Sequence, residues 1–323
     1  MAASGFWLPG NWPLVTRVVV LGAAGFLGSH LCDALISRGD SVIGVDDFSS
    51  GRKENIKHLE GSLAFSFHEQ NIVQELHISG HIDAVLNFAS PASPDRYREM
   101  PLHTLRTGSA GTDHALQLAS REGARLIMAS TSEVYGEPLI HPQPESYWGN
   151  VNPIGERSCY DEAKRYSEAL CMAYKREQST DIGIARIFNT YGPRLSAGDG
   201  RVVSNFITQA IEGKPLSIYG DGLQTRSFCF VDDLVRGILA LLDSTEVGPI
   251  NIGSTDECSM LQLAETILEL TGSASILDFQ PKVVDDPTQR RPNIDLAKNK
   301  LGWEPTVSLR DGLKKTIHFF KSA

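Results

Sequence analysis

The chain has 323 residues, of which 41% are hydrophobic and 21% are charged, and its formal net charge is −9. This composition is typical of a soluble globular protein with one large or two modest domains. The acidic excess argues against a nucleic-acid-binding protein, and no apolar run is long enough to span a bilayer. We therefore expect neither a nucleic-acid partner nor a membrane partner.

Residues 1–16 contain two tryptophans and two prolines but no lysine or arginine. They lack the charged start and the apolar middle of a signal peptide, so we interpret them as an irregular N-terminal arm. The five cysteines have no CxxC spacing and are odd in number. This pattern favours a reducing compartment, and we expect a cytoplasmic location.

Strands and helices alternate over the first part of the chain. A short apolar run over 17–21 predicts a buried strand, a helix is expected over 29–38, and a second strand is expected over 41–46. Further strands are expected over 83–88, 125–129 and 182–187, and helices over 107–122 and 159–177. Repeated βα units predict an α/β protein with a doubly wound, Rossmann-like parallel sheet.

The pattern changes near residue 188. We expect a loop over 189–200, a strand over 249–252, and helices over 203–213, 260–270 and 310–319. The predicted sheet domain therefore covers 17–187 and is completed by about 228–254. A smaller C-terminal α/β part is predicted from 188–227 and 255–323.

Glycines at positions 22, 25 and 28 lie between the first strand and the first helix. This spacing allows a tight turn, a close approach of backbone to a pyrophosphate, and close packing of helix on strand. Asp46 ends the second strand, where an acid accepts hydrogen bonds from ribose hydroxyls and repels a 2′-phosphate. The sequence therefore predicts NAD as the cofactor, although Arg52 and Lys53 leave NADP open. A tight turn without a ligand is the plainer alternative.

Tyr160 and Lys164 are four residues apart in a predicted helix and therefore share one face. The lysine charge is expected to lower the pKa of the phenol and to make it a proton acceptor for an alcohol. Such pairs also occur by chance in helices. The glycine turn and Asp46 favour the catalytic interpretation.

This combination resembles the extended short-chain dehydrogenase/reductase superfamily over nearly the whole chain. That superfamily completes its site with a Ser or Thr on the strand before the Tyr helix. Here the segment Ala-Ser-Thr-Ser-Glu-Val-Tyr-Gly over 129–136 ends such a strand. The resemblance implies that Thr131 holds the reacting alcohol, and Ser132 is the second candidate.

Longer motifs narrow the resemblance to the UDP-glucuronate decarboxylases, also called UDP-xylose synthases. They include Ala-Ser-Pro-Ala-Ser-Pro over 89–94, Asn-Pro-Ile-Gly-Glu-Arg over 152–157 and Cys-Tyr-Asp-Glu-Ala-Lys-Arg over 159–165. Segments over 187–194, 199–206, 219–226, 285–287 and 290–292 continue the likeness. A polar turn and surface charges are the plainer alternatives for these segments taken singly.

The resemblance implies a reaction in which the hydride is borrowed and returned. Tyr160 takes the proton of the sugar 4-hydroxyl and NAD takes the hydride, which gives a β-keto acid. This acid loses carbon dioxide, the resulting enolate is protonated, and the hydride then returns to carbon 4. Glu133 falls where the family has a catalytic glutamate, and Arg290 falls where it has an arginine near the sugar carboxylate.

The resemblance also implies contacts with the two ligands. Implied cofactor contacts are Gly22, Gly25, Phe26, Leu27, Gly28, Asp46, Asp47, Phe48, Ser50, Gly51, Asn71, Ile72, Ala89, Tyr160 and Lys164. Implied contacts with a UDP-sugar are Arg106, Asn189, Arg194, Arg201, Val202, Asn205, Tyr219, Gln224, Arg226 and Arg290. No metal site is expected.

Several positions depart from the family pattern. An Asp occupies position 47, where Asn is frequent, and an Asn occupies position 71, where an Asp often contacts adenine. Arg106 replaces a common Lys, and Gly108 replaces a common Asn. The last two leave the identity of the sugar open.

Three alternatives share the fold: a nucleotide-sugar 4-epimerase, a 4,6-dehydratase, and a decarboxylase that releases the 4-keto pentose and NADH. Ser132 counts against the dehydratase, because that class usually carries an Asp at this position. An inactive NAD-sensing scaffold is a further alternative. We also expect a homodimer, with Leu116, Ala119, Leu170 and Tyr174 as residues that either form its face or pack inside one subunit.

Overall fold

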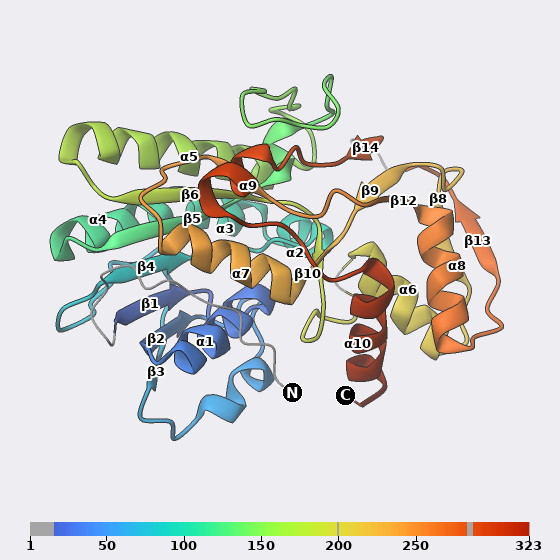
Figure 1. The fold of residues 1–323 in the computed structure, drawn as a ribbon, viewed down its shortest axis with the longest axis horizontal. Coiled ribbons are helices and arrows are strands. Elements are labelled where there is room, and N and C mark those ends of the chain that lie inside the picture. The colour runs from blue at the N-terminus through green and yellow to red at the C-terminus, as the bar shows by residue number, and fades with distance from the viewer. Residues whose placement is uncertain (1–15, 199, 283–286, 323) are drawn as a thin grey trace.

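A seven-stranded parallel sheet forms the centre of the molecule (Figure 1). The computed structural model describes residues 16–198, 200–282 and 287–322. The strand order is β11-β6-β5-β4-β1-β2-β3. These strands are β1 (Arg17–Leu21), β2 (Ser41–Asp46), β3 (Phe65–Glu69), β4 (Ala84–Asn87), β5 (Arg125–Thr131), β6 (Ile182–Ile187) and β11 (Ile250–Ile252). The predicted doubly wound α/β fold is confirmed.

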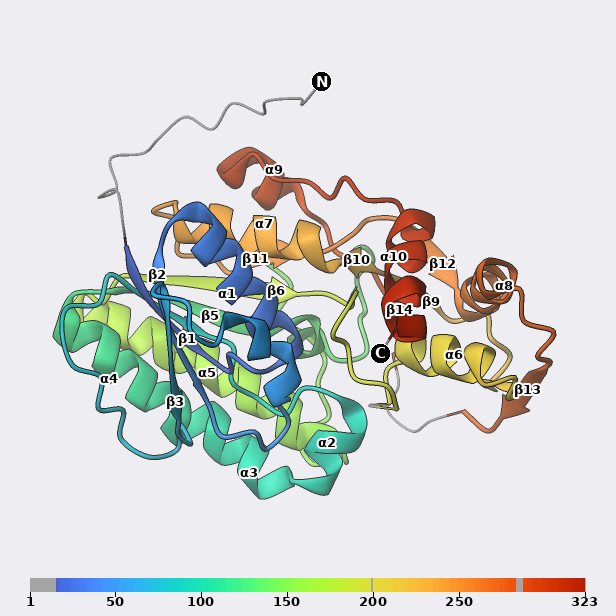
Figure 2. The same ribbon diagram turned by 90° about the horizontal axis from the view of Figure 1, so that it is seen from below.

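Helices cover both faces of the sheet, and Figure 2 shows α1 and α7 on one face and α4 and α5 on the other. The helices are α1 (Phe26–Arg38), α2 (Pro94–Glu99), α3 (Pro101–Arg106), α4 (Thr112–Glu122), α5 (Ser158–Gln178), α6 (Val202–Ile211), α7 (Val231–Leu242), α8 (Met260–Thr271), α9 (Asp295–Leu301) and α10 (Leu309–Ser322). Strand β11 comes from the segment predicted to complete the sheet, and it pairs with β6.

The two layers follow from the alternation of side chains along each strand. Val18 and Val20 of β1 belong to the same buried cluster as Leu35 of α1. Val19 and Leu21 belong to the cluster on the other face of the sheet, which contains Leu116 of α4. Successive side chains of a strand point to opposite faces, so an unbroken apolar run fills both cores.

The strand order reverses between β1 and β4, because β2 and β3 extend the sheet on one side of β1 and β4 to β6 on the other. Ligands of open α/β sheets bind beyond the carboxyl ends of the strands at such a reversal. The glycine turn follows β1, and Thr131 ends β5. The fold therefore places the predicted cofactor and catalytic segments at one edge of the sheet.

The C-terminal part is built from short strands with α6, α8 and α10 beside them (Figure 1). The strands are β7 (Thr190–Tyr191), β8 (Leu216–Tyr219), β9 (Thr225–Ser227), β10 (Cys229–Phe230), β12 (Glu257–Ser259), β13 (Leu277–Gln280) and β14 (Gln289–Arg290). They form three small sheets in the orders β12-β9-β14, β13-β8 and β10-β7.

Some predicted boundaries are wrong. The helix expected from residue 107 begins earlier, since α3 leads through a π-helical turn (Thr107–Gly111) into α4. Strand β3 was not predicted because its Phe-Ser-Phe-His-Glu sequence is half polar, as suits an edge strand. The loop expected over 189–200 contains β7. The N-terminal arm lies outside the described residues apart from Thr16.

Candidate active site

The glycine turn brings β1, β4 and α1 into close contact. Gly22 has φ of 82°, and a Cβ atom there would lie 2.8 Å from the backbone of Ala89. A Cβ atom on Gly28 would lie 2.0 Å from the carbonyl oxygen of Gly22. Gly25 precedes α1, whose first turn has neither a side-chain cap nor an acidic residue. Its N–H groups therefore remain suited to a phosphate.

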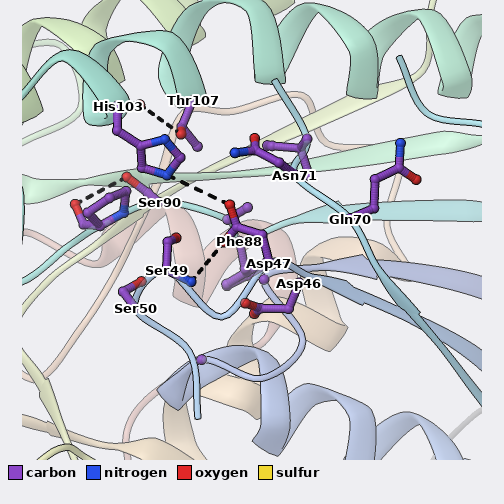
Figure 3. A pocket seen from close by; sticks show the side chains of 15 residues that line it. Asp46, Asp47, Ser49, Ser50, Gln70, Asn71, Phe88, Ser90, His103 and Thr107 are labelled. Carbon is purple, nitrogen blue, oxygen red and sulfur yellow. Dashed lines mark hydrogen bonds and ion pairs between the residues drawn. The ribbon is translucent and has the colours of Figure 1, made fainter. Parts of the chain in front are cut away.

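A cavity opens beside this turn, and Figure 3 shows its polar side chains. The predicted cofactor contacts that line it are Gly22, Gly25, Asp46, Asp47, Ser50, Asn71, Ile72 and Ala89. Lining residues that the sequence analysis did not assign are Ser49, Gln70, Phe88, Ser90, Pro91, His103 and Thr107. Most of these are immediate sequence neighbours of predicted contacts, and this proximity could have identified them from the sequence.

Asp46 lies in the wall of this cavity. Its carboxylate accepts hydrogen bonds from the backbone N–H groups of Ala24 and Phe48, both at 2.9 Å. Burial raises the pKa of Asp46, and the two hydrogen bonds oppose that shift. A Cβ atom on Gly51 would lie 2.7 Å from the same carboxylate. Each carboxylate oxygen still has a lone pair for a ribose hydroxyl.

Three predicted cofactor contacts shape the cavity without lining it, namely Gly28, Phe48 and Gly51. Asn71 lines the cavity, but its side-chain oxygen already accepts a hydrogen bond from Val73 N at 2.8 Å. The uncapped helix end, the glycine cradle and the acid after β2 together fit a dinucleotide. We infer that these residues would hold NAD.

A second, larger cleft adjoins the first and contains the predicted catalytic residues. Thr131, Ser132, Glu133, Tyr160 and Lys164 all line it. Phe26 and Leu27, at the start of α1, line it as well. Tyr160 and Lys164 come from one face of α5, and the other three come from the end of β5 and the turn after it.

The phenol and the ammonium of the predicted pair are both buried. Lys164 Nζ donates a hydrogen bond to the carbonyl oxygen of Ala129 at 2.8 Å and lies 5.8 Å from the centre of the Tyr160 ring. The ring of Tyr97 stacks on Tyr160, with centroids 5.2 Å apart and an interplanar angle of 8°. These contacts hold the Tyr160 ring in one orientation.

The expectation that the pKa of Tyr160 is lowered is wrong. Burial raises the pKa of Tyr160 to about 12, although its hydrogen bond with Thr131 and the charge of Arg201 oppose the shift. Burial also lowers the pKa of Lys164 to about 8. Removal from water disfavours the charged form of both groups and is the largest cause of both shifts.

Glu133 lies between two guanidinium groups. Its Oε2 atom is 2.5 Å from Nη2 of Arg157 and 3.5 Å from Nη2 of Arg290. Arg290 also donates to the carbonyl oxygens of Ser132 and Gly136. Burial raises the pKa of Glu133, but Arg290 and Arg157 outweigh it and lower the pKa to about 2. Glu133 is therefore a carboxylate at any ordinary pH.

Most of the predicted UDP-sugar contacts line the same cleft. They are Asn189, Arg201, Val202, Asn205, Tyr219, Gln224 and Arg226. Arg290 lies immediately behind the lining, 1% exposed, and contacts Glu133. The cleft thus joins the Tyr–Lys pair to a group of arginines that suits an anionic substrate.

Two predicted UDP-sugar contacts lie elsewhere. Arg194 pairs with Asp33 of α1 at 2.5 Å, and its backbone has φ of 67°. Arg106 is exposed on α3, while His103 and Thr107 of the same helical segment line the cofactor cavity. Both predictions rested on the position of the arginine in a motif. In the structure, the side chain of Arg194 is directed to Asp33, and Arg106 lies on the exposed side of α3.

Three cleft residues of clear chemical interest were not predicted, namely Tyr97, Arg98 and Arg157. Arg157 precedes Tyr160 by three residues at the start of α5, a spacing that places both on one helix face. That spacing was a usable signal. Tyr97 and Arg98 come from the short helix α2, which was not predicted.

Of the two alternatives left open for Leu116, Ala119, Leu170 and Tyr174, packing inside one subunit is the one observed. Leu116 and Ala119 are fully buried inside the subunit, and Leu170 and Tyr174 pack against the same cluster.

Among the described residues, no helix is both long enough and apolar enough to cross a bilayer.

Comparison with known proteins gives the family. A model of the NAD dependent epimerase/dehydratase family matches residues 18–253. The chain belongs to this family. The prediction of NAD as the cofactor is thereby confirmed. The matched stretch contains the glycine turn, Glu133 and the Tyr–Lys pair, but it ends before Arg290.

Within the NAD dependent epimerase/dehydratase family, several curated relatives at about half identity are UDP-glucuronic acid decarboxylases. UDP-glucuronic acid decarboxylase 1 of Arabidopsis thaliana is 51% identical over 95% of this chain and 70% of the relative. UDP-glucuronic acid decarboxylase 1 of Xenopus tropicalis is 50% identical over 94% of this chain and 72% of the relative. The predicted resemblance is confirmed.

Solved structures of the family agree with the fold. UDP-glucose 4-epimerase of Thermotoga maritima, with UDP-glucose, has a TM-score of 0.87 at 32% identity and covers 95% of this chain and 99% of its own. UDP-glucuronic acid 4-epimerase of Bacillus cereus, in complex with UDP-glucuronic acid and NAD, has a TM-score of 0.86 at 30% identity and the same coverage.

Proposed function

We propose that this protein decarboxylates UDP-glucuronate to UDP-xylose through a 4-keto intermediate and regenerates its NAD within each cycle. Sequence identity of 50–51% to UDP-glucuronic acid decarboxylases over nearly the whole chain supports this function. The structural observation that carries it is the cluster of Glu133 and Arg157, which line the cleft of Tyr160, with Arg290, which lies behind the lining and contacts Glu133. Two guanidinium groups around one glutamate leave a net positive charge that suits the carboxylate of the sugar.

Tyr160 and Thr131 are the groups suited to the 4-hydroxyl of the sugar. Both line the cleft, and the Thr131 hydroxyl is near enough to the phenol to oppose the rise of its pKa, so together they can hold one substrate oxygen. Tyr160 must be a phenolate to accept the proton of the 4-hydroxyl, and because burial raises its pKa, this ionisation depends on positive charge nearby. NAD, when bound, would supply a cationic hydride acceptor that later returns the hydride. Lys164 contributes a buried positive charge that favours the phenolate when the proton moves.

Glu133 and Arg290 are the groups suited to the loss of carbon dioxide. As carbon dioxide leaves, the electrons of the broken bond move into the ketone, and the enolate that forms then takes a proton from solvent at the same carbon. Arg290 and Arg157 place positive charge where that negative charge develops. Glu133 stays ionised between them, so its first role is to hold the two guanidinium groups in position.

We also propose a division of labour between the two parts of the chain. Residues 17–187, completed by about 228–254, would bind NAD, while 188–227 and 255–323 would bind the nucleotide-sugar. The support is that cofactor contacts cluster in the first part, whereas Arg201, Tyr219 and Arg226 come from the second.

A homodimer in the cytoplasm remains part of the proposal. The exposed apolar side chains of Leu102 and Leu105 on α3 and of Tyr166 on α5 support a subunit interface there. The five cysteines are all free thiols, which suits a reducing compartment. Sedimentation of the purified protein tests the assembly.

Incubation with UDP-glucuronate and NAD, followed by mass spectrometry, tests the function. The expected result is release of carbon dioxide and formation of UDP-xylose without accumulation of NADH. Accumulation of NADH together with a 4-keto pentose would replace the proposal by oxidative decarboxylation. Conversion of UDP-glucuronate to an isomer of the same mass would replace it by 4-epimerisation.

A further inference from the structure

Arg290 reaches the catalytic turn from a segment that belongs to neither the central sheet nor the matched family stretch. Its short strand β14 pairs with β9 over only two residues. Yet Arg290 is almost fully buried and makes hydrogen bonds to Ser132 and Gly136 on either side of Glu133. So short a pairing cannot by itself hold a guanidinium at one place, and additional contacts must position it.

The side chain of Asn251, in the middle of β11, supplies such a contact. It is fully buried, and its Nδ2 atom donates to the carbonyl oxygens of Gln143 at 2.9 Å and Asn293 at 3.0 Å. Its Oδ1 atom accepts from the hydroxyl of Tyr135 at 2.8 Å. Both amide protons and the amide oxygen therefore have partners, and these partners determine the orientation of the amide.

Gln143 completes the attachment of the Arg290 segment. Its backbone N–H donates to the carbonyl oxygen of Arg291, and its side-chain oxygen accepts from the N–H of Arg291, both at 2.9 Å. Its carbonyl oxygen also accepts from the N–H of Asn293 at 2.9 Å. Gln143 is thus paired with the three residues that follow Arg290, and Asn251 donates a hydrogen bond to each side of this pairing.

The other end of the Asn251 amide leads back to the catalytic turn. Tyr135 is two residues beyond Glu133, and its hydroxyl also accepts from Arg186 Nη1 at 3.0 Å. Arg186 pairs with Glu168 of α5 at 2.8 Å, and Glu168 in turn accepts a hydrogen bond from Ser130 at 2.5 Å. A continuous polar network, buried at Asn251 and Tyr135 and part-buried at Arg186 and Glu168, thus joins the end of β5 to the Arg290 segment.

We propose that Asn251 is a positioning residue for decarboxylation, which holds the Arg290 segment against the Glu133 turn. This inference rests on the proposed function. Asn251 touches neither of the two ligand clefts, and it acts through Arg290 rather than on the substrate. Its loss affects carbon dioxide release, which needs Arg290, more than the first hydride transfer, which needs Tyr160.

The variant Asn251→Asp tests this role. It keeps the size of the side chain and an acceptor for Tyr135, but a carboxylate oxygen then faces carbonyl oxygens that it cannot bond. In single turnovers with UDP-glucuronate, the rate of carbon dioxide release should fall by ~10- to ~100-fold, because small misplacements of a catalytic group have effects of this size. The rate at which bound NAD is reduced should change by less than about threefold. Hydrogen exchange of residues 288–293 should become faster.

Two further variants keep the test decisive. Asn299→Asp makes the same chemical change at an exposed position of α9 and should leave both rates and the exchange unaltered. Tyr135→Phe removes one hydroxyl and should reproduce the selective loss in milder form, even if Asn251→Asp does not fold. Equal loss of both rates, or unchanged exchange of 288–293 in a folded variant, would overturn the role of Asn251. If the unmodified protein releases no carbon dioxide, the proposed function fails, and the exchange measurement alone decides whether Asn251 holds the segment.

Discussion

Arg290 and Glu133 are 157 residues apart in the chain, yet Nη2 of the arginine lies 3.5 Å from Oε2 of the glutamate. Arg290→Ala should reduce the rate of carbon dioxide release by roughly 10²- to 10³-fold, because it removes positive charge from a buried site where negative charge develops. The dissociation constant for NAD should stay within about twofold of the unmodified value. Isotope-labelled substrate and calorimetric NAD titration measure the two quantities. An unaltered release rate would return Arg290 to a structural role.

Tyr160→Phe tests the proton acceptor. The variant keeps the ring that stacks on Tyr97 but lacks the hydroxyl, so we expect turnover to fall by roughly 10²- to 10⁴-fold. NAD binding and the melting temperature should be nearly unchanged. Turnover at the normal rate would exclude Tyr160 from the mechanism, whereas lost NAD binding would assign it to the cofactor.

Lys164→Met tests the effect of a buried charge on stability. The pKa of Lys164 is lowered to about 8 in the folded protein, so the unfolded chain binds this proton more tightly. Wild-type stability is therefore reduced at pH values below about 8, and the penalty disappears as the pH rises toward the ordinary lysine value. In protein stripped of nucleotide, the variant should melt several degrees above the wild type at pH 7, and the gap should narrow near pH 10. A gap that widens with pH contradicts the lowered pKa.

Asp46→Asn tests cofactor choice. The carboxylate lies in the cofactor cavity, where it would accept from ribose hydroxyls and repel a 2′-phosphate. We expect NAD to bind roughly tenfold more weakly and NADP to bind measurably. The ratio of the two dissociation constants is the useful quantity, because any loosening of the turn affects both. An unchanged ratio would mean that another residue, such as Arg52, sets the preference.

Gly28→Ala tests the close packing of α1. The added Cβ atom would lie 2.0 Å from the carbonyl oxygen of Gly22, so α1 must shift and unfolding should become easier by about 1–3 kcal/mol. NAD affinity should fall as well. Gly39→Ala is the control, since it has φ of 98° but nothing within 4 Å of the added atom. It should lower stability without altering NAD affinity, which separates backbone strain from the clash at the cofactor turn.

The local parts of the molecule were predictable from the sequence. The apolar runs of β1 and β2, the glycine turn between β1 and α1, and the four-residue spacing of Tyr160 and Lys164 depend on neighbours in the chain. Periodicity and backbone sterics act over a few residues, so they can be recognised in the sequence and confirmed in the fold.

Only the tertiary structure decided which distant residues meet and how burial changes them. Arg194 resembled a substrate contact but pairs with Asp33, whereas Arg157 was not assigned and lies 2.5 Å from Glu133. Burial raises the pKa of Tyr160 where the sequence suggested that Lys164 would lower it. Contacts between remote segments and the removal of a charge from water are consequences of packing, and packing is not encoded in the spacing of residues along the chain.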